Sequence, residues 1–174
     1  MNDPKILFQG YRFRVERAIQ VTPDGVKHVR EVVRHPGAVV ILPLLDDGRI
    51  CLLWNYRVAV RERIIELPAG TLEPNEDPAE TARRELIEET GYRAGRIEHL
   101  ISFWTTPGIF DERMHLYLAE QLQPGPTALE AGEDIEPLLV TWDEAMEMMR
   151  QGKIQDAKTL TALLYFRAYR PSKG

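Results

Sequence analysis

The pattern of apolar and polar residues changes period several times along the chain, and each change predicts a change of secondary structure. Near the N-terminus Tyr11, Phe13 and Val15 alternate with charged residues, which is the period-2 pattern of a β-strand. A Pro-Asp-Gly turn follows at residues 23–25, and residues 26–33 then predict the returning strand of a β-hairpin. An isolated hairpin is only marginally stable in water, so we expect this one to pack on something else, such as another subunit.

Five further strands are predicted in the rest of the chain, at residues 38–45, 49–57, 99–106, 114–120 and 136–142. The first of these, AVVILPLL, is apolar throughout, as expected of a strand that is buried on both faces. A turn of two aspartates and a glycine separates it from the second strand. The last strand has a proline near its start, which is tolerated at the first residues of a strand or at a sheet edge.

The first predicted helix begins at Pro78 and ends near Gly91. Asp77 can cap its N-terminus, proline suits the first helical position, and Glu80 can complete a capping box. Glycine at the end of a helix is a common stop signal, because it readily adopts the left-handed conformation. These signals define both ends of a helix that contains the acidic sequence RRELIEETG.

Two more helices are predicted near the C-terminus. One begins with a capping-box pattern at residues 141–144 and ends near Gly152, and its apolar stripe is typical of core packing. The other runs from about residue 156 to residue 169, and three of its leucines are expected to face the core: Leu160, Leu163 and Leu164. Strands and helices interspersed in this way predict an α/β sandwich, with a mixed sheet between flanking helices and the N-terminal hairpin set apart.

The composition is that of an ordinary globular protein. The chain has 174 residues, of which 44% are hydrophobic and 28% charged, and this length suits one domain with a real core. No apolar run approaches the ~20 residues that span a membrane, and the net charge of −5 argues against sequence-independent binding of nucleic acids. The single cysteine, Cys51, cannot form an internal disulfide, so we expect a cytoplasmic protein.

The sequence RRELIEETGY, in the first predicted helix, places three carboxylates on one helix face, because Glu85, Glu88 and Glu89 are spaced i, i+3 and i+4. They flank the apolar stripe of the helix, and partial burial strengthens their repulsion unless something compensates it. A divalent cation such as Mg²⁺ would compensate it, since hard cations bind carboxylate oxygens. The alternative is a solvated acidic face whose charge is offset by Arg83 and Arg84.

A longer motif surrounds these glutamates. From Gly70 the chain reads GTLEPNEDPAETARRELIEETGY, in which five residues separate the glycine from Glu76 and seven more precede the sequence RELIEETGY. This pattern resembles the signature of the Nudix hydrolases, G-x5-E-x7-R-E-U-x-E-E-x-G-U, where U is a bulky apolar residue. Every fixed position matches, with Tyr92 a slightly unusual last residue. The resemblance implies the Nudix fold and the hydrolysis of a nucleoside diphosphate linked to another group.

The resemblance also implies roles for residues of the motif. Glu85 and Glu89 would be the principal metal ligands, Glu88 would assist, and the backbone carbonyl of Ala69 would be a further ligand. The metal would be Mg²⁺, or Mn²⁺ or another divalent ion in its place, and it would neutralise the pyrophosphate and activate a water molecule. Arg84 lies four residues before Glu88 and would pair with it to orient the carboxylates, so Glu85 and Arg84 belong to the expected catalytic set. The alternative for Arg84 is an ordinary surface salt bridge.

Segments outside the motif resemble the ADP-ribose pyrophosphatase subfamily. Pro107, expected beside the substrate, lies sixteen positions after the last glycine of the motif, and four short sequences also look like that group: REVVRHPGAVV, NYR, ELPAG and DAKTLTALLY. The resemblance covers roughly residues 10–170. It divides the chain into an N-terminal hairpin unit (1–36), for dimerisation and substrate recognition, and a Nudix hydrolase domain (37–174) that contains the motif at 70–92.

The subfamily resemblance implies further substrate contacts. Arg57 would bind the phosphates or the terminal ribose, since a guanidinium group matches oxyanions. Arg30 and Glu31 would reach the adenine or its ribose from the hairpin, although a solvated strand face explains them equally well. Glu66 and Glu112 would contact the ribose or water near the metal. The N-terminal strands would join the active site of the partner in an intertwined homodimer.

The general base is expected on the acidic loop TALEAGEDIEP, at residues 127–137, which could close over the substrate. Matching this loop to the family favours Glu133. Glu130 and Glu136 remain alternatives, and so does Glu73 in the loop of the motif.

The sequence therefore predicts a Mg²⁺-dependent pyrophosphatase that hydrolyses ADP-ribose to AMP and ribose 5-phosphate. The first alternative is the same chemistry on another substrate, such as a nucleotide sugar, NADH, FAD or a dinucleoside polyphosphate. The second alternative is a non-catalytic ADP-ribose sensor on the same scaffold, and the complete set of three glutamates argues against it.

Overall fold

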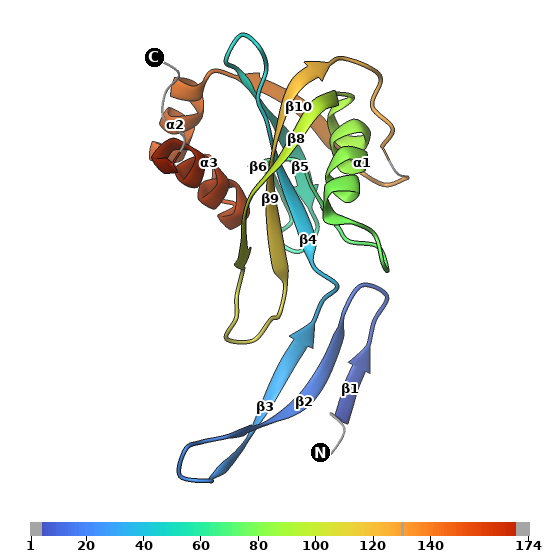
Figure 1. Cartoon of the computed structure of the whole chain (residues 1–174), viewed down its shortest axis with the longest axis vertical. Helices are drawn as coiled ribbons and strands as arrows, with labels where there is room; N and C mark the ends of the chain where they lie inside the picture. Colours follow the sequence, from blue (N-terminus) through green and yellow to red (C-terminus); the bar gives the residue numbers. More distant parts are fainter. Residues whose placement is uncertain (1–4, 130, 170–174) are drawn as a thin grey trace.

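The structure, a computed structural model, describes residues 5–129 and 131–169. In chain order its elements are β1 (Lys5–Gln9), β2 (Arg14–Val21), β3 (Lys27–Arg34), β4 (Ala38–Pro43), β5 (Ile50–Arg57), β6 (Glu62–Glu66), β7 (Ala69–Thr71), α1 (Pro78–Thr90), β8 (Arg93–Trp104), β9 (Arg113–Gln123), β10 (Ile135–Val140), α2 (Trp142–Arg150) and α3 (Ala157–Tyr169). The sheets formed by strands β4 to β10 lie between α1 on one side and α2 and α3 on the other (Figure 1). This arrangement confirms the predicted α/β sandwich of a mixed sheet with flanking helices.

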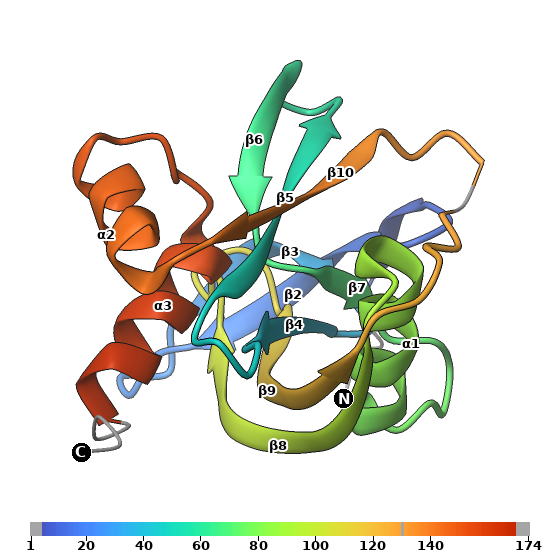
Figure 2. The same ribbon diagram turned by 90° about the horizontal axis from the view of Figure 1, so that it is seen from above.

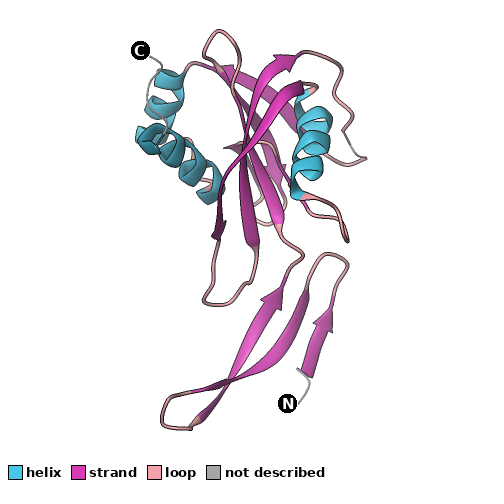
Figure 3. Cartoon of the chain, in the orientation of Figure 1, coloured by secondary structure: helices cyan, strands magenta, loops and turns pink. Residues whose placement is uncertain are grey.

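Two sheets form the body of the protein, and a third lies at its N-terminal end (Figure 3). The four-stranded sheet has the order β7-β4-β9-β8, and its central pair, β4 and β9, is parallel while the outer pairs are antiparallel. The other sheet of the body, β10-β5-β6, is antiparallel throughout. Viewed from above, β10 runs from the side of α1 toward α2 (Figure 2), so the loop before β10 lies near α1.

Strand β4 joins the two hydrophobic cores of the body. All of its residues are buried, as the unbroken apolar run predicted. Val39 and Ile41 pack in one core with Ala82 and Leu86 of α1, whereas the alternate residues of β4 face a larger core that includes residues of α3. Because side chains alternate along a strand, one apolar strand can hold a helix on each side. This packing fixes the position of α1 against the sheet.

The N-terminal unit differs from the predicted hairpin, because a third strand, β1, pairs with β2, which in turn pairs with β3. The strand expected from Tyr11 begins only at Arg14. Residues 10–13 form a turn instead, in which the backbone N–H of Gly10 donates to the carbonyl of Phe13 at 2.9 Å. The alternation of aromatic and arginine residues in this segment was therefore a misleading strand signal.

The loop between β8 and β9 connects the N-terminal sheet to the body. Val33 donates its backbone N–H to the carbonyl of Ile109 at 2.8 Å, and its own carbonyl accepts from Asp111 at 3.1 Å. Arg34 adds an ion pair with Asp111 at 3.0 Å. Beyond this contact the sheet extends away from the body (Figure 1). The division of the chain into units of residues 1–36 and 37–174 stays a prediction.

The remaining differences from the predicted elements are small. Strands β1, β6 and β7 were not predicted, and none of them has more than five residues. In α3 the prediction for Leu164 was wrong, because this side chain is 54% exposed. The helix is rotated so that its buried residues are Thr159, Ala162 and Leu163. Among the described residues, no helix is both long and apolar enough to cross a membrane.

Candidate active site

The acidic helix α1 has two well-defined ends and one buried face. Asp77 caps it by accepting a hydrogen bond from the backbone N–H of Ala79 at 2.7 Å, and Gly91 ends it in the left-handed conformation at φ 75°. Its buried residues include one carboxylate among small and apolar side chains: Thr81, Ala82, Leu86, Glu89 and Thr90. The predicted proximity of the glutamates to the buried stripe is therefore confirmed.

The short strand β7 places the first residues of the motif against α1. Ala69 donates its backbone N–H to Oε2 of Glu89 at 2.9 Å. The carboxylate of Glu85 lies over Gly70, where an added Cβ atom would come within 1.9 Å of it. Any side chain at this position would have to displace Glu85. The glycine of the motif thus permits close approach of the loop to the helix.

Burial makes Glu85 and Glu89 costly to ionise. Glu89 is only 4% exposed. Its burial outweighs the hydrogen bond from Ala69 and, together with the charges of Glu85 and Glu133, raises the pKa of Glu89 to about 8. Burial also raises the pKa of Glu85, and the charges of Glu88 and Glu133 act in the same direction. Two such carboxylates favour any positive charge that can reach them.

Arg84 ties the acidic cluster to the loop of the motif. Its Nη1 donates to Glu85 at 2.7 Å and to Glu88 at 3.1 Å, while its Nε and Nη2 each donate to Glu76 at 3.1 Å. The hydrogen bonds to Glu76 are the largest cause that raises the pKa of Arg84. The expected pairing of Arg84 with Glu88 is confirmed, and its catalytic role stays a prediction.

The donor atoms of this cluster suit a hard divalent cation. Within the described ranges, no three acidic, histidine or cysteine side chains are placed to hold a metal ion as they stand. Arg84 holds Glu85 and Glu88, and Glu89 accepts from the amide of Ala69. The available donors are nevertheless carboxylate and carbonyl oxygens, which Mg²⁺ prefers. A cation would also offset the cost of ionising the two buried carboxylates, so these residues fit a metal after a change of rotamers.

The acidic loop before β10 is fastened on both sides of Glu133. Ala128 donates its backbone N–H to the carbonyl of Glu88 at 2.9 Å, and Tyr56 donates to the carbonyl of Asp134 at 3.1 Å. The Glu133 side chain is exposed. Its charge raises the pKa of two glutamates of α1, which places it in their neighbourhood. The structure thus brings the expected base and the expected metal ligands together.

The alternatives for the general base are placed differently. Glu136 lies in β10 and is within 3.5 Å of Arg63 on β6. Glu73 is exposed in the loop of the motif, where its backbone N–H donates to Glu76 at 3.2 Å. Glu130 lies outside the described residues. The choice of Glu133 as the base stays a prediction.

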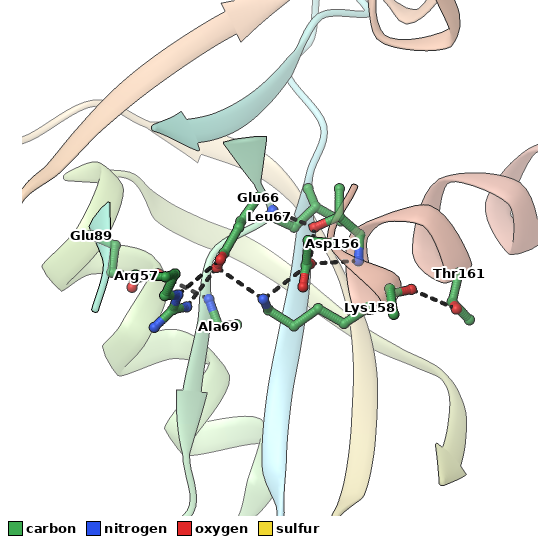
Figure 4. Close-up of polar contacts among 10 residues, drawn as sticks. Arg57, Glu66, Leu67, Ala69, Glu89, Asp156, Lys158 and Thr161 are labelled. Atoms are coloured by element: carbon green, nitrogen blue, oxygen red, sulfur yellow. Dashed lines mark hydrogen bonds and ion pairs between the residues drawn. The ribbon is translucent and has the colours of Figure 1, made fainter. Parts of the chain in front are cut away.

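Arg57, the expected phosphate or ribose contact, ends β5 near Glu89 (Figure 4). It donates twice to Glu66, from Nε to Oε1 at 2.8 Å and from Nη2 to Oε2 at 2.5 Å. Glu66 also accepts from Lys158 of α3 at 2.9 Å. Both oxygens of Glu66 are therefore engaged, and its contact with substrate stays a prediction. Lys158 was not predicted as a site residue. The one feature of the sequence that could have indicated it is its position in DAKTLTALLY, one of the segments that resemble the subfamily.

The structure does not gather the other expected substrate contacts around α1. Arg30 and Glu31 lie on β3 and contact residues of β2. Pro107 lies in the loop between β8 and β9, which contacts β3, and Glu112 accepts a hydrogen bond from Thr105 at 2.8 Å. Their roles in substrate binding stay predictions.

Comparisons with known proteins agree with the features of this site. The family model of the NUDIX domain matches residues 33–163. An ADP-ribose pyrophosphatase of Bacillus subtilis (strain 168) is 41% identical over 145 residues, which are 82% of this chain and 78% of that protein. A methanol dehydrogenase activator of Bacillus methanolicus is 43% identical over the same shares of the two chains. A GDP-mannose pyrophosphatase of Cronobacter sakazakii (strain ATCC BAA-894) is 39% identical over 80% of this chain and 79% of its own.

A solved structure supports the architecture. The crystal structure of an ADP compounds hydrolase superposes with a TM-score of 0.81 and covers 97% of this chain and 95% of that chain. The sequences are 24% identical. At this level of identity the likeness concerns the fold, including the N-terminal sheet within the matched length.

Proposed function

This chain belongs to the NUDIX domain family of hydrolases, and from that membership we propose that it hydrolyses the pyrophosphate bond of ADP-ribose to give AMP and ribose 5-phosphate. One observation carries the proposal: the buried Glu89 lies near Arg57, and the charge of Glu133 acts on both Glu89 and its neighbour Glu85. A pyrophosphate needs positive charge, and its hydrolysis needs a base for the attacking water. The site offers groups for both tasks in one place.

The divalent cation, proposed to be Mg²⁺, would be held by Glu85, Glu88 and Glu89 and by the backbone carbonyl of Ala69. When bound, such a cation neutralises the pyrophosphate, polarises a phosphorus–oxygen bond and lowers the pKa of water. The buried glutamates supply the negative charge for it. Ala69 of β7 is held next to Glu89, because its backbone N–H donates to Oε2 of Glu89 at 2.9 Å. Arg84 holds two of the carboxylates in place until the cation binds.

The side chains around the cluster would perform the remaining steps. Glu133 would take a proton onto its carboxylate from the water that attacks one phosphorus. Arg57 would bind the pyrophosphate already in the ground state and keep this contact as charge develops on the leaving phosphate, because its guanidinium group is held in place by Glu66. Backbone hydrogen bonds of Ala128 and Asp134 anchor the loop that bears Glu133 on both sides of it, which supports a role for this carboxylate beside the metal-binding helix.

The substrate is supported by similarity rather than by geometry. The ADP-ribose pyrophosphatase of Bacillus subtilis shares 41% of aligned residues with this chain, and the GDP-mannose pyrophosphatase of Cronobacter sakazakii shares 39%. GDP-mannose is therefore the second candidate, because it presents the same pyrophosphate between a nucleoside and a sugar. Both substrates would use the same acidic cluster on α1, and they would differ in the protein groups that contact the nucleobase and the sugar.

A product screen tests the substrate. The purified protein is assayed with and without Mg²⁺ on ADP-ribose, GDP-mannose, NADH, FAD, diadenosine polyphosphates and oxidised dGTP. The proposal expects Mg²⁺-dependent release of AMP from ADP-ribose at the highest kcat/KM of the set. Faster turnover of GDP-mannose would make it the substrate, and no turnover of any compound would leave an ADP-ribose sensor as the better account.

We also propose a homodimer in which the N-terminal sheet crosses to the neighbouring subunit. Several apolar side chains of this sheet are more than half exposed in the single chain: Ile6, Phe8, Tyr11, Ile19, Val21 and Val29. Burial of such side chains stabilises association, and the crossing would bring Arg30 and Glu31 to the partner's site. Sedimentation at micromolar concentration would show a dimer, whereas a fully active monomer would contradict it. The single, buried cysteine agrees with the proposed cytoplasmic location.

A further inference from the structure

A row of alternating charges runs from α3 to the active site (Figure 4). It begins at Asp156, whose Oδ2 is 3.0 Å from Nζ of Lys158. Lys158 contacts Glu66 at 2.9 Å, and Glu66 is paired with Arg57 at 2.5 Å. The charge of Arg57 in turn lowers the pKa of Glu89. Five charged side chains thus connect the start of a distant helix to an expected metal ligand.

The inner members of this row are shielded from water. Glu66 has a side-chain exposure of 2%, and that of Lys158 is 12%, whereas Arg57 is 41% exposed. Buried ion pairs are sensitive to the loss of one partner, because the remaining charge stays desolvated. Arg57, in contrast, has a free end: among the described residues none accepts a hydrogen bond from its Nη1, while Nε and Nη2 are bound to Glu66. The free end is the part that can meet a phosphate.

The start of α3 holds Lys158 in place. Asp156 accepts hydrogen bonds from the backbone N–H of Thr159 at 3.0 Å and from its hydroxyl at 2.6 Å. The same hydroxyl accepts from the backbone N–H of Leu67 at 2.8 Å. Leu67 follows Glu66 directly, so α3 is fastened to the end of β6 by a side-chain ion pair and by a hydrogen bond to the backbone. This geometry leaves Lys158 little freedom to point elsewhere.

The charges of the row explain what Lys158 does for Arg57. Without Lys158, Glu66 would cancel the charge of Arg57, and the pair would present little net charge to an anion. Lys158 balances part of the negative charge of Glu66, so Arg57 keeps more of its positive charge for the substrate. We propose that Lys158 is a positioning residue that acts through Glu66 to keep Arg57 oriented and effectively cationic toward the pyrophosphate. The inference rests on the proposed contact of Arg57 with the substrate.

The first test separates charge from packing. Lys158→Gln keeps a hydrogen-bond donor toward Glu66 but removes the charge, and Lys158→Arg keeps the charge. We expect Lys158→Gln to raise KM for ADP-ribose about tenfold, equivalent to about 1.4 kcal/mol of binding, with kcat within about threefold of wild type. Lys158→Arg should restore KM to within about threefold. Lys153→Gln, at an exposed lysine of the preceding loop, is the matched control and should behave as wild type.

A double-mutant cycle then shows whether Lys158 acts through Arg57. In the Arg57→Ala background, Lys158→Gln should change kcat/KM by less than about twofold, because coupled residues are not additive. If the two substitutions instead lower kcat/KM by independent factors that multiply in the double variant, the proposal is overturned. An unchanged KM in Lys158→Gln would also overturn it, and so would a failure of both Lys158→Gln and Lys158→Met to fold while Arg57→Ala folds, which would make the lysine purely structural.

The coupling between Lys158 and Arg57 can be tested whichever nucleotide proves to be the substrate. If the wild-type protein hydrolyses GDP-mannose in preference to ADP-ribose, the proposed substrate is wrong, and the same cycle is measured with GDP-mannose. Coupling of Lys158 and Arg57 in that assay would still support the positioning role, and additivity would still overturn it.

Discussion

Two carboxylates in this protein are buried to nearly the same extent, and yet their pKa values are shifted in opposite directions. Glu66 is 2% exposed and Glu89 is 4% exposed. Burial raises the pKa of both, but at Glu66 this effect is outweighed by Arg57 and Lys158, so its pKa lies below the ordinary value. At Glu89 burial prevails and the pKa rises to about 8. The difference comes from the neighbours of the two side chains.

Glu66 therefore differs from Glu89 in whether the fold itself supplies the cations that balance its charge. Glu66 has its cations built into the fold, so it is already neutralised. Glu89 accepts one backbone N–H and has two glutamates nearby, and this hydrogen bond and the charge of Arg57 offset only part of the cost of its burial. A fold that keeps such a carboxylate buried loses stability unless binding of a cation restores it. A buried carboxylate without a balancing cation is where we expect the proposed chemistry to take place.

The largest expected effect comes from substitution of the proposed general base, Glu133, which is neither of the two buried carboxylates. Glu133→Gln should lower kcat for ADP-ribose by about 10²–10⁴-fold and leave KM nearly unchanged. The reason is that a base acts on the proton of water in the transition state, whereas a ground-state contact would appear mainly in KM. The measurement is kcat and KM at several Mg²⁺ concentrations.

The matched controls for this prediction are Glu136→Gln, Glu73→Gln and Glu130→Gln. Glu136→Gln and Glu73→Gln should stay within about tenfold of wild type, since both side chains are exposed and the effect of a surface carboxylate is small. Glu130→Gln is measured beside them. A Glu133→Gln variant within threefold of wild type would end the assignment. The role would then pass to whichever of the other three shows a loss of kcat that added Mg²⁺ does not recover.

The unbalanced carboxylates should be the next most sensitive positions. Glu85→Gln and Glu89→Gln each lose a charged ligand, and we expect turnover to fall about 10²-fold, the upper end of what the loss of an outer-shell partner typically costs. Unlike the defect of Glu133→Gln, this one should be partly recovered by high Mg²⁺. Near-wild-type rates in both variants at saturating Mg²⁺ would show that the metal assignment is wrong.

The balanced carboxylate should respond in its stability. Glu66→Gln leaves Arg57 and Lys158 without their anion, and we expect a loss of about 1–3 kcal/mol in the free energy of unfolding. The lower part of this range is favoured because Arg57 is 41% exposed and water can replace part of the lost interaction. Urea unfolding measures the change, with Glu62→Gln at the exposed start of β6 as the control. Unchanged stability would remove the contrast between the two carboxylates.

The sequence predicted most of the layers and the acidic cluster, for identifiable physical reasons. The unbroken apolar run of β4, the Asp77 cap of α1 and the capping box of α2 are local signals, and the structure contains them as expected. At α1 the structure records the Asp77 cap but not the capping box expected through Glu80. The spacing of Glu85, Glu88 and Glu89 likewise determines that they share one side of a helix. Such features need only the residues of one element.

The missed features depend on contacts between distant elements. The ion pair of Lys158 with Glu66 joins positions 92 residues apart, and no local pattern predicts such a distance. The turn at residues 10–13 was mistaken for a strand because its aromatic residues alternate with arginines, and the hydrogen bond that closes it is not visible in the pattern. The rotation of α3 that exposes Leu164 is likewise set by packing against the sheet.

The central claim, that Glu89 is buried in readiness for a cation, is tested most directly by the stability of Glu89→Gln beside wild type. Because the folded-state pKa is raised to about 8 from about 4.3 in an unfolded chain, ionisation destabilises the metal-free protein progressively as the pH rises between these values. In EDTA, Glu89→Gln should therefore be more stable than wild type by about 1–3 kcal/mol at pH 8 and by much less at pH 5. Saturating Mg²⁺ should stabilise wild type clearly and the variant only weakly. Equal stabilisation of both by Mg²⁺, or a less stable variant in EDTA at pH 8, would contradict the account.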